Sequence, residues 1–378
     1  MKKHSAVIAA LALLSVAAAF AVTIACNSAA KRTPDFVFSD PSPAVASTVE
    51  SEPPPLPPAQ TEESSEIGGE PQGLIPSVIT SNDPRNFSKI VFDGFDIIIE
   101  GVSADRLIVS ACLFSDGVEE PAEYDGDSYR IVLKDKKTDG GFDTIYIYTA
   151  AGVVLDYRVC AAPDGFKSID TSDIAENNFR LAQTPADLPI EGVLQYITPD
   201  GDPSRAREVM AQVEEISDRI CEGIPDDYAK AMAISEWVAE NIYYDFDASE
   251  SSVTAETVSL SHVLETHRTV CGGFSNIYSA LCAAQGITVY NVQGEAVSDV
   301  LNSFAETDTG SFHEWNYAVI DGKGVWADAC WETYNYYRDG QYVYGKTRSK
   351  YFDISDSVMS YDHRVKVCWS RDYYAAIE

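Results

Sequence analysis

The chain has 378 residues, 59 of them acidic and 27 basic, which gives a formal net charge of −32. This length is enough for more than one domain with a hydrophobic core of its own. The acidic charge disfavours nucleic acid as a partner, because phosphate contacts need a basic surface, and it is typical of an exported, soluble protein.

The first 25 residues have the pattern of a signal peptide. Lys2 and Lys3 precede an apolar run that extends from Ala6 to Ala25, as in the charged and apolar parts of such signals. The run ends at Cys26 in a segment that resembles a bacterial lipobox, which implies that Cys26 is the lipidated first residue of the mature chain. About 20 apolar residues can also span a bilayer uncleaved. Either way we expect the protein on the extracellular face of the cell membrane, attached by a lipid or by the uncleaved segment.

Residues 26–86 have the composition of a disordered stalk. The segment contains a run of prolines within residues 53–58, followed by a Ser/Glu-rich stretch at residues 61–66. Few of these residues could bury enough apolar area to offset the entropic cost of ordering. Proline and repelling carboxylates keep such a segment extended, which would hold a folded part away from a membrane.

Residues 87–164 are predicted to form a small all-β sandwich. Residues 142–148 and 153–159 are rich in Ile, Val and Tyr and flank a short Ala-Ala-Gly segment. Earlier strand candidates are residues 89–92, 96–100, 107–113 and 129–133. Short strands separated by turn residues favour a sandwich. No catalytic constellation is apparent here, so we expect a spacer or a binding module.

Residues 165–225 are predicted to be a connector with one helix. Asp202 is a suitable N-cap with Pro203 at the first helical position, and apolar residues recur at helical spacing up to Ile220. Gly223 is expected to end this helix. Pro225 and Asp226 then open a second helix and a further domain, residues 226–378.

A reactive cysteine is predicted at the start of a buried helix. After Cys271, apolar residues follow at positions typical of one helix face, namely Phe274, Ile277, Tyr278, Leu281 and Cys282. Gly286 suits the left-handed residue after a helix end. The helix dipole favours a thiolate at Cys271, and the thiolate is the nucleophilic form of cysteine. Gly272 and Gly273 are expected to leave room for a substrate backbone.

A hairpin downstream of this helix supplies a candidate base and its partner. His313 lies in an aromatic-rich strand, residues 313–320, and Asp328 lies in the strand that follows Asp321-Gly322. Asp-Gly favours a two-residue hairpin turn. Such a turn places Trp315 opposite Asp328 and makes His313 the diagonal neighbour of Asp328 on one face. A four-residue turn would keep the facing but lengthen the contact.

Three segments in this order resemble the motif blocks of the transglutaminase-like superfamily. They are Val-Cys-Gly-Gly at residues 270–273, His-Glu-Trp-Asn at residues 313–316 and Trp-Ala-Asp-Ala-Cys-Trp at residues 326–331. The resemblance implies an α+β fold with a papain-like core, in which helices pack on an antiparallel sheet. It also implies a Cys-His-Asp triad formed by Cys271, His313 and Asp328. The superfamily includes acyltransferases, proteases, amidases and inactive members, so the resemblance does not fix the reaction.

The sequence does not favour a metal site at this cysteine. His262, His267 and Cys271 have the spacing H-x4-H-x3-C, but a fourth ligand is missing. No complete EF-hand spacing accompanies the acidic residues either. We therefore predict no metal and no cofactor. His363 lies beyond the three motifs and is interpreted as a surface or structural histidine.

The other cysteines and the tyrosines after residue 332 are expected to have structural roles. Besides Cys26 and Cys271, the chain has six cysteines, for which sequence cannot choose among 15 pairings. A Cys112–Cys160 disulfide is conceivable, Cys282 is expected in the core, and few disulfides are expected in total. A second hairpin should bring Tyr334, Tyr336 and Tyr337 opposite Tyr342 and Tyr344 across Asp339-Gly340, and we favour ordinary strand residues over a substrate platform.

The sequence thus predicts a cell-surface thiol enzyme that acts on protein or peptide amides through a thioester at Cys271, by acyl transfer or by hydrolysis. Its partners would be exported or cell-wall proteins and peptides, and the membrane through the anchor. The alternative is a wall-binding or adhesive lipoprotein that uses the same fold without catalysis. A second oxyanion donor, besides the Cys271 N–H, is unassigned, with Trp237 and Tyr244 as candidates.

Overall fold

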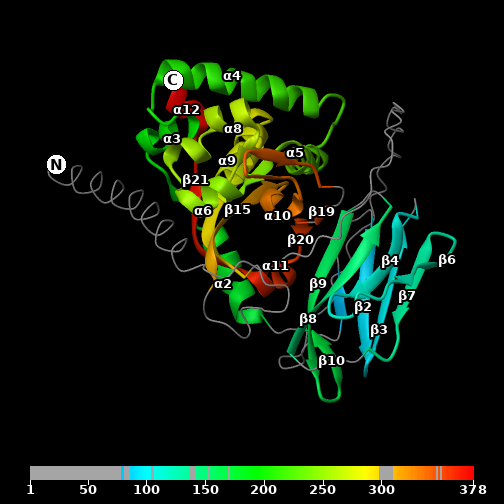
Figure 1. Ribbon diagram of the computed structural model, residues 1–378. Coiled ribbons are helices and arrows are strands. Elements are labelled where there is room, and N and C mark those ends of the chain that lie inside the picture. Colours follow the sequence, from blue (N-terminus) through cyan, green and yellow to red (C-terminus); the bar gives the residue numbers. More distant parts are fainter. Residues whose placement is uncertain are drawn as a thin grey trace. The chain divides into compact units, whose positions relative to one another are not determined.

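The computed structural model describes residues 78–80, 86–103, 106–136, 141–150, 153–168, 171–297, 310–345, 348–349 and 351–378. The signal peptide, Cys26 and nearly all of the expected stalk lie outside these residues. Within them, no helix combines the length and the apolar character needed to cross a membrane. The expected α+β class is confirmed, with an all-β region before a core of helices and sheet (Figure 1).

Two antiparallel sheets make up the all-β region, which we call the β-sandwich. Its strands are β1 (Val78–Thr80), β2 (Asn86–Asp93), β3 (Asp96–Ser103), β4 (Ile108–Leu113), β5 (Glu120–Pro121), β6 (Glu123–Asp125), β7 (Ser128–Leu133), β8 (Gly141–Thr149), β9 (Val153–Ala162) and β10 (Gly165–Ser168). One sheet has the order β1-β2-β3-β7-β6 and the other β10-β9-β8-β4-β5. The strands therefore extend past the expected limits of residues 87 and 164 at both ends.

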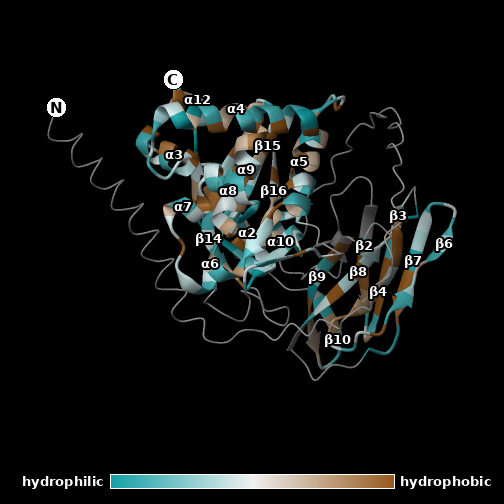
Figure 2. Cartoon of the chain, turned by 45° about the horizontal axis from the view of Figure 1, so that its top comes forward, coloured by the Kyte–Doolittle hydropathy of each residue, from teal (hydrophilic) through white to brown (hydrophobic). Residues whose placement is uncertain are grey.

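The β-sandwich holds together through alternate residues that face inwards from both sheets. Ile97 and Ile99 of one sheet and Ile145 and Ile147 of the other are fully buried in a common core. Charged residues alternate with apolar ones along β9, which carries teal bands among brown ones in Figure 2. Period-two alternation places these charged residues on the face of β9 opposite the common core, where Arg158 is buried as well.

The remaining elements form a helical layer against a six-stranded sheet, together with a separate four-stranded sheet and one short strand that pairs with β9 of the β-sandwich. They are α2 (Ser172–Ala182), β11 (Ala186–Asp187), α3 (Ile190–Ile197), α4 (Pro203–Ile220), α5 (Asp227–Asn241), β12 (Tyr243–Asp245), α6 (Phe246–Ser251), α7 (Ala255–Val258), α8 (Leu260–Thr266), β13 (Arg268–Thr269), α9 (Cys271–Ala284), β14 (Thr288–Ala296), β15 (Ser311–Ile320), β16 (Lys323–Ala327), α10 (Ala329–Glu332), β17 (Tyr336–Arg338), β18 (Gln341–Val343), β19 (Arg348–Ser349), β20 (Phe352–Ile354), α11 (Asp356–Asp362), β21 (His363–Ser370) and α12 (Tyr373–Ile377).

The central sheet, with the order β11-β21-β14-β15-β16-β20, is buried on both faces. Ala318 and Ile320 of β15 pack on one face with helices α4, α5 and α9. Trp315 and Tyr317 alternate with them and pack on the other face with residues of α2 and α11. Since side chains of a strand point alternately to opposite faces, β15 belongs to both cores.

The segment predicted as a connector is part of this second core. Asp202 caps α4 by accepting a hydrogen bond from the N–H of Ser204, as expected from the Asp-Pro pair. However, Val193 of α3 and Met210 of α4 are buried in the same cluster as α9, and β11 pairs with β21. Residues 171–225 thus pack as part of the core rather than only connecting two domains, a fact that local periodicity could not reveal.

Helix α9 begins and ends where the sequence predicts. It starts at Cys271, and Gly286 follows its C-cap residue with φ +74°. The Gly286 N–H donates to the Ala283 carbonyl and the Ile287 N–H to the Cys282 carbonyl. These two bonds form the Schellman motif that ends helices at glycine. The eleven residues from Gly272 to Cys282 are all buried.

Both predicted hairpins are confirmed. Ile320 pairs with Lys323 across Asp321-Gly322, and both turn residues have positive φ, 51° and 76°, as a type I′ turn requires. In the second hairpin Tyr337 pairs with Tyr342 as expected, but Tyr336 pairs with Val343, and Tyr334 and Tyr344 lie outside the paired strands.

The described cysteines form no disulfide bonds with one another. All seven cysteines among the described residues are free thiols, so Cys112 does not pair with Cys160. Cys282 is fully buried, as expected for a residue of the core helix face. The hydroxyl of Tyr148, rather than Cys160, lies within hydrogen-bond range of Cys112 Sγ, at 3.6 Å.

Candidate active site

Cys271 is the first residue of α9, and it is partly exposed whereas most of the helix after it is buried. Its N-cap, Val270, offers no side-chain hydrogen bond to the helix start. The first backbone N–H groups of a helix have no intrahelical partner. The positive end of the helix therefore lies at the sulfur, where it favours negative charge.

The two glycines after Cys271 serve the packing of the protein itself, which corrects the expectation that they make room for substrate. A Cβ on Gly273 would overlap the side chain of Thr269, which is buried and donates to the Thr257 carbonyl. A Cβ on Gly272 would lie 3.2 Å from Glu314 Oε2. Glycine is needed here because the helix start lies so close to its neighbours.

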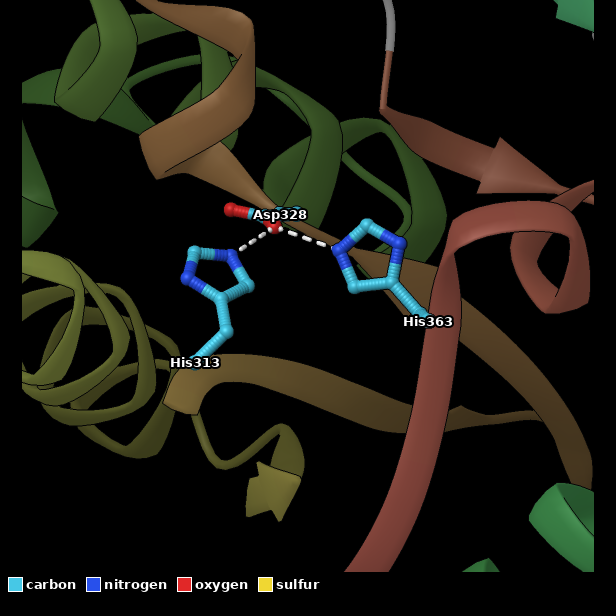
Figure 3. Close-up of side chains that lie close together, drawn as sticks. All are labelled: His313, Asp328 and His363. Carbon is cyan, nitrogen blue, oxygen red and sulfur yellow. Dashed lines mark hydrogen bonds and ion pairs between the residues drawn. The ribbon is translucent and has the colours of Figure 1, made fainter. Parts of the chain in front are cut away.

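His313 and Asp328 meet as the hairpin register predicts. His313 Nε2 lies 2.6 Å from Asp328 Oδ2, and both side chains are almost fully buried. Figure 3 shows the imidazole and the carboxylate facing each other, with the second ring nitrogen of His313 directed away from Asp328. Asp328 also caps α10, because its Oδ1 accepts a hydrogen bond from the Trp331 N–H at 3.0 Å.

Each residue of this pair stabilises the charged form of the other. Burial alone would lower the pKa of His313, but the charge and hydrogen bond of Asp328 outweigh it, and a hydrogen bond with Cys271 adds to the rise, to about 9. Burial would raise the pKa of Asp328, but His313 and His363 hold it well below its ordinary value. Because Nε2 of His313 faces Asp328, Nδ1 is the nitrogen left for Cys271.

His363, interpreted from sequence as a surface or structural histidine, is fully buried, which excludes the surface alternative, and its place beside the site was not foreseen. Its Nε2 lies 3.0 Å from the same Oδ2 of Asp328 that His313 contacts, and its Nδ1 lies 2.5 Å from Asp362 Oδ1 (Figure 3 shows the contact with Asp328). Burial would lower the pKa of His363, but the two carboxylates raise it to about 9. Only pairing of β21 with β14 brings it here, and no local motif signals such a pairing.

His313, Asp328 and His363 also have the composition of a metal site. Their separations of 2.6 and 3.0 Å are those of charge-assisted N–H···O hydrogen bonds. Both ring nitrogens of His363 already face carboxylates. We therefore assign hydrogen bonds to this cluster. The rival metal ligands His262 and His267 are not part of it, and His267 is an exposed residue at the end of α8.

The charge of Cys271 influences the ionisation of Tyr244, which belongs to β12. Burial, together with Cys271 and Cys330, raises the pKa of Tyr244, so its hydroxyl keeps its proton. The other oxyanion candidate, Trp237 of α5, packs at the edge of the core around α9. Tyr244 and Cys271 pack against the same core, so the Tyr244 hydroxyl and the Trp237 indole N–H both remain candidates.

Known proteins resemble part of this chain. The model of the family described as the transglutaminase-like superfamily matches residues 214–329. The kyphoscoliosis peptidases of Mus musculus and Homo sapiens are each 22% identical to the chain, over 124 and 120 residues, which is 32% of this chain and 18% of each relative. The chain therefore spans about a fifth of the length of these curated relatives.

Solved structures that match part of the chain share little sequence with it. A candidate cysteine protease from Cytophaga hutchinsonii is 18% identical, with a TM-score of 0.27 and coverage of 64% of this chain and 74% of that one. A structure described as a TGase is 13% identical, with a TM-score of 0.28 and coverage of 63% and 56%.

Proposed function

Because residues 214–329 match the model of the transglutaminase-like superfamily, we propose that the chain is a thiol enzyme that acts on protein or peptide amides through a thioester at Cys271. The observation that carries this proposal is the 2.6 Å contact between His313 and Asp328. It is supported by the place of Cys271 at the start of α9 and by the contribution of Cys271 to the raised pKa of His313. A nucleophile, a base and a residue that orients the base are what acyl transfer requires.

The reaction would run in two steps. Cys271 Sγ attacks the amide carbon, the proton held by His313 passes to the nitrogen that leaves, and a thioester remains. His313 then takes a proton from an amine or a water molecule that attacks the thioester, and Cys271 is released. Asp328 stabilises the charged imidazole throughout without taking its proton.

The oxyanion of each tetrahedral intermediate needs hydrogen-bond donors. The Cys271 N–H is one, since it lies at the start of α9. We assign the Tyr244 hydroxyl as the second, because it remains protonated beside Cys271.

Alkylation by iodoacetamide tests whether Cys271 is the reactive thiol. Burial raises the pKa of the thiols of Cys221, Cys282, Cys330 and Cys368, so these should react slowly near pH 7. We expect mass spectrometry to find Cys271 labelled at least ten times faster, and His313→Ala to remove the difference. Uniform labelling, or labelling insensitive to His313→Ala, would favour the non-catalytic, wall-binding alternative.

A second assay separates transfer from hydrolysis. A glutamine peptide is incubated with the protein and a primary amine, and the product masses are measured. Amine incorporation supports acyl transfer, whereas cleavage of the chain or deamidation supports hydrolysis. Cys271→Ser should abolish either product, which makes it the matched control.

We also propose that the enzyme works outside the cytoplasm, lipid-anchored through Cys26, on exported or cell-wall proteins. The charged and apolar segments before Cys26 support this proposal. Metabolic labelling with an alkyne fatty acid should mark the wild type and leave Cys26→Ala unlabelled. Labelling of neither chain would leave an uncleaved N-terminal segment as the anchor.

A further inference from the structure

A chain of buried charges leads from the candidate catalytic pair to the β-sandwich. Asp328 contacts His363, and His363 contacts Asp362 at the end of α11. Asp362 Oδ2 accepts a hydrogen bond from Arg158 Nε at 3.2 Å. Arg158 belongs to β9, and its side chain is 5% exposed. The four side chains alternate in sign, and each is almost completely buried.

Helix α11 makes this connection rigid. Its Val358 and Tyr361 pack in the core of the β-sandwich, whereas Met359 packs against the central sheet. Arg158 is fixed further, because its Nη2 donates to the Val297 carbonyl at 3.0 Å. A helix shared by two cores cannot move relative to either without losing packing on one side.

The hydrogen-bond geometry determines the protonation of His363. Ionised carboxylates only accept hydrogen bonds, so a ring with a carboxylate opposite each nitrogen must carry two protons. With His363 cationic, the series Asp328, His363, Asp362 and Arg158 is electrically balanced. Buried charges are tolerated when paired and hydrogen-bonded in this way.

We propose that His363 and Arg158 are positioning residues of the active site, so that the β-sandwich is a structural part of the catalytic machinery rather than a spacer. Arg158 holds Asp362, Asp362 holds the His363 imidazolium, and His363 fixes Oδ2 of Asp328 where His313 needs it. The inference rests on the proposed function, because it assigns Asp328 and His313 to catalysis.

This arrangement has an electrostatic consequence that packing alone would not have. The charged groups that face His313 are Asp328 before α10, Cys271 of α9, His363 of β21 and its own neighbour Glu314. The rings of His313 and His363 are 5.4 Å apart. A second imidazolium at this distance repels the positive charge on His313 and shares the negative charge of Asp328 with it. His363 therefore lowers the pKa of His313.

Titration of His313 by NMR, with labelled histidine, tests the inference without any substrate. His363→Gln keeps an N–H toward Asp328 but removes the charge. We expect the pKa of His313 to rise by about one unit in this variant. An unchanged or lowered pKa of His313, in a variant that melts cooperatively, would overturn the proposal.

Iodoacetamide labelling of Cys271 tests the role of the β-sandwich. We expect Arg158→Met to slow labelling about tenfold at pH 7 and Arg158→Lys to restore most of the rate. Arg130→Met is the matched control, because Arg130 forms only a half-exposed ion pair with Glu100 on β3; it should react as the wild type does. If Arg158→Met fails to fold, the charge-neutral pair Arg158→Met with Asp362→Asn should fold and show the same loss.

The outcomes distinguish this inference from the proposed function. If wild-type Cys271 reacts like the other thiols but His363→Gln still shifts the His313 titration, the connection stands and catalysis is disproved. If Cys271 is fast and Arg158→Met, folded, reacts as fast as Arg130→Met, the β-sandwich has no positioning role.

Discussion

Asp328 combines three tasks in one carboxylate. Its Oδ1 caps α10, and its Oδ2 accepts hydrogen bonds from His313 and His363. A buried carboxylate with three donors is held in one orientation and stays ionised. The candidate base is thus oriented by a residue that the fold itself holds in place.

Replacing Asp328 by Asn separates these tasks. Asparagine caps helices as well as aspartate does, but it would leave His313 without a negative partner. We expect the chain to fold with a reduced melting temperature and the rate of amide turnover to fall at least about a hundredfold. In the wild type the rate should persist up to about pH 9, where His313 loses its proton. Asp202→Asn, at the cap of α4, should leave the rate unchanged.

Tyr244→Phe tests the second oxyanion donor. The change removes one hydroxyl and little volume, so stability should alter by less than about 1 kcal/mol, while kcat falls about 10- to 100-fold. Steady-state kinetics on the glutamine peptide would measure it. Tyr243→Phe is the neighbouring control, and equal kinetics of the two variants would exclude Tyr244 from the oxyanion site.

Single residues were predictable from sequence where the signal is local. Cys271, His313 and Asp328 lie on a helix start and a two-residue hairpin, and both are encoded within about 20 residues. Their contact follows from strand register, although their catalytic roles remain a prediction. His363 and Arg158 reach the site through pairings between distant segments, which no local pattern encodes.

At the scale of elements, the start of α9 is the most tightly constrained. Gly273 packs against Thr269 so closely that no side chain fits, whereas Gly272 has slightly more space beside Glu314 and Val258. The sequence predicted the helix from its period. It could not predict what lies against Gly272, because Val258 and Glu314 reach that residue only through the tertiary packing of α7 and β15.

Alanine at these two positions should therefore have unequal costs. We expect Gly273→Ala to destabilise the fold by about 1–3 kcal/mol and to displace Cys271, which lowers its alkylation rate. Gly272→Ala, whose Cβ would have contacts of 3.2–3.3 Å, should cost less. Urea unfolding gives the stabilities, and the reverse order would contradict the packing described here.

At the scale of the whole molecule, the Tyr351 hydroxyl lies between two carboxylates, one from the β-sandwich and one from α11. Asp156 of β9 and Asp362 both lie within hydrogen-bond distance of the Tyr351 hydroxyl, at 3.2 and 2.9 Å. One O–H can donate to only one of them at a time. Burial and the charge of Asp362 raise the pKa of Asp156 to about 7, so it can carry a proton itself.

This predicts that stability depends on pH near neutrality. Because the pKa of Asp156 is raised on folding, its contribution is complete below pH 3.8 and is lost as the pH rises to about 7. Asp156→Asn should stabilise the chain by about 2 kcal/mol at pH 8 and not at pH 4. Thermal melting at both pH values checks this, and an equal effect at both would contradict the assignment.

The free thiols have a chemical consequence for a protein exposed to oxidants. Among the described residues, five of the seven cysteines lie in the interior, and Cys160 and Cys271 are partly accessible. Peroxide would therefore reach Cys271 early and convert it to a sulfenic acid, which thiol reductants reverse. If Cys271 is the catalytic thiol, the proposed activity would be highest in reducing surroundings and would be lost on aeration long before the fold.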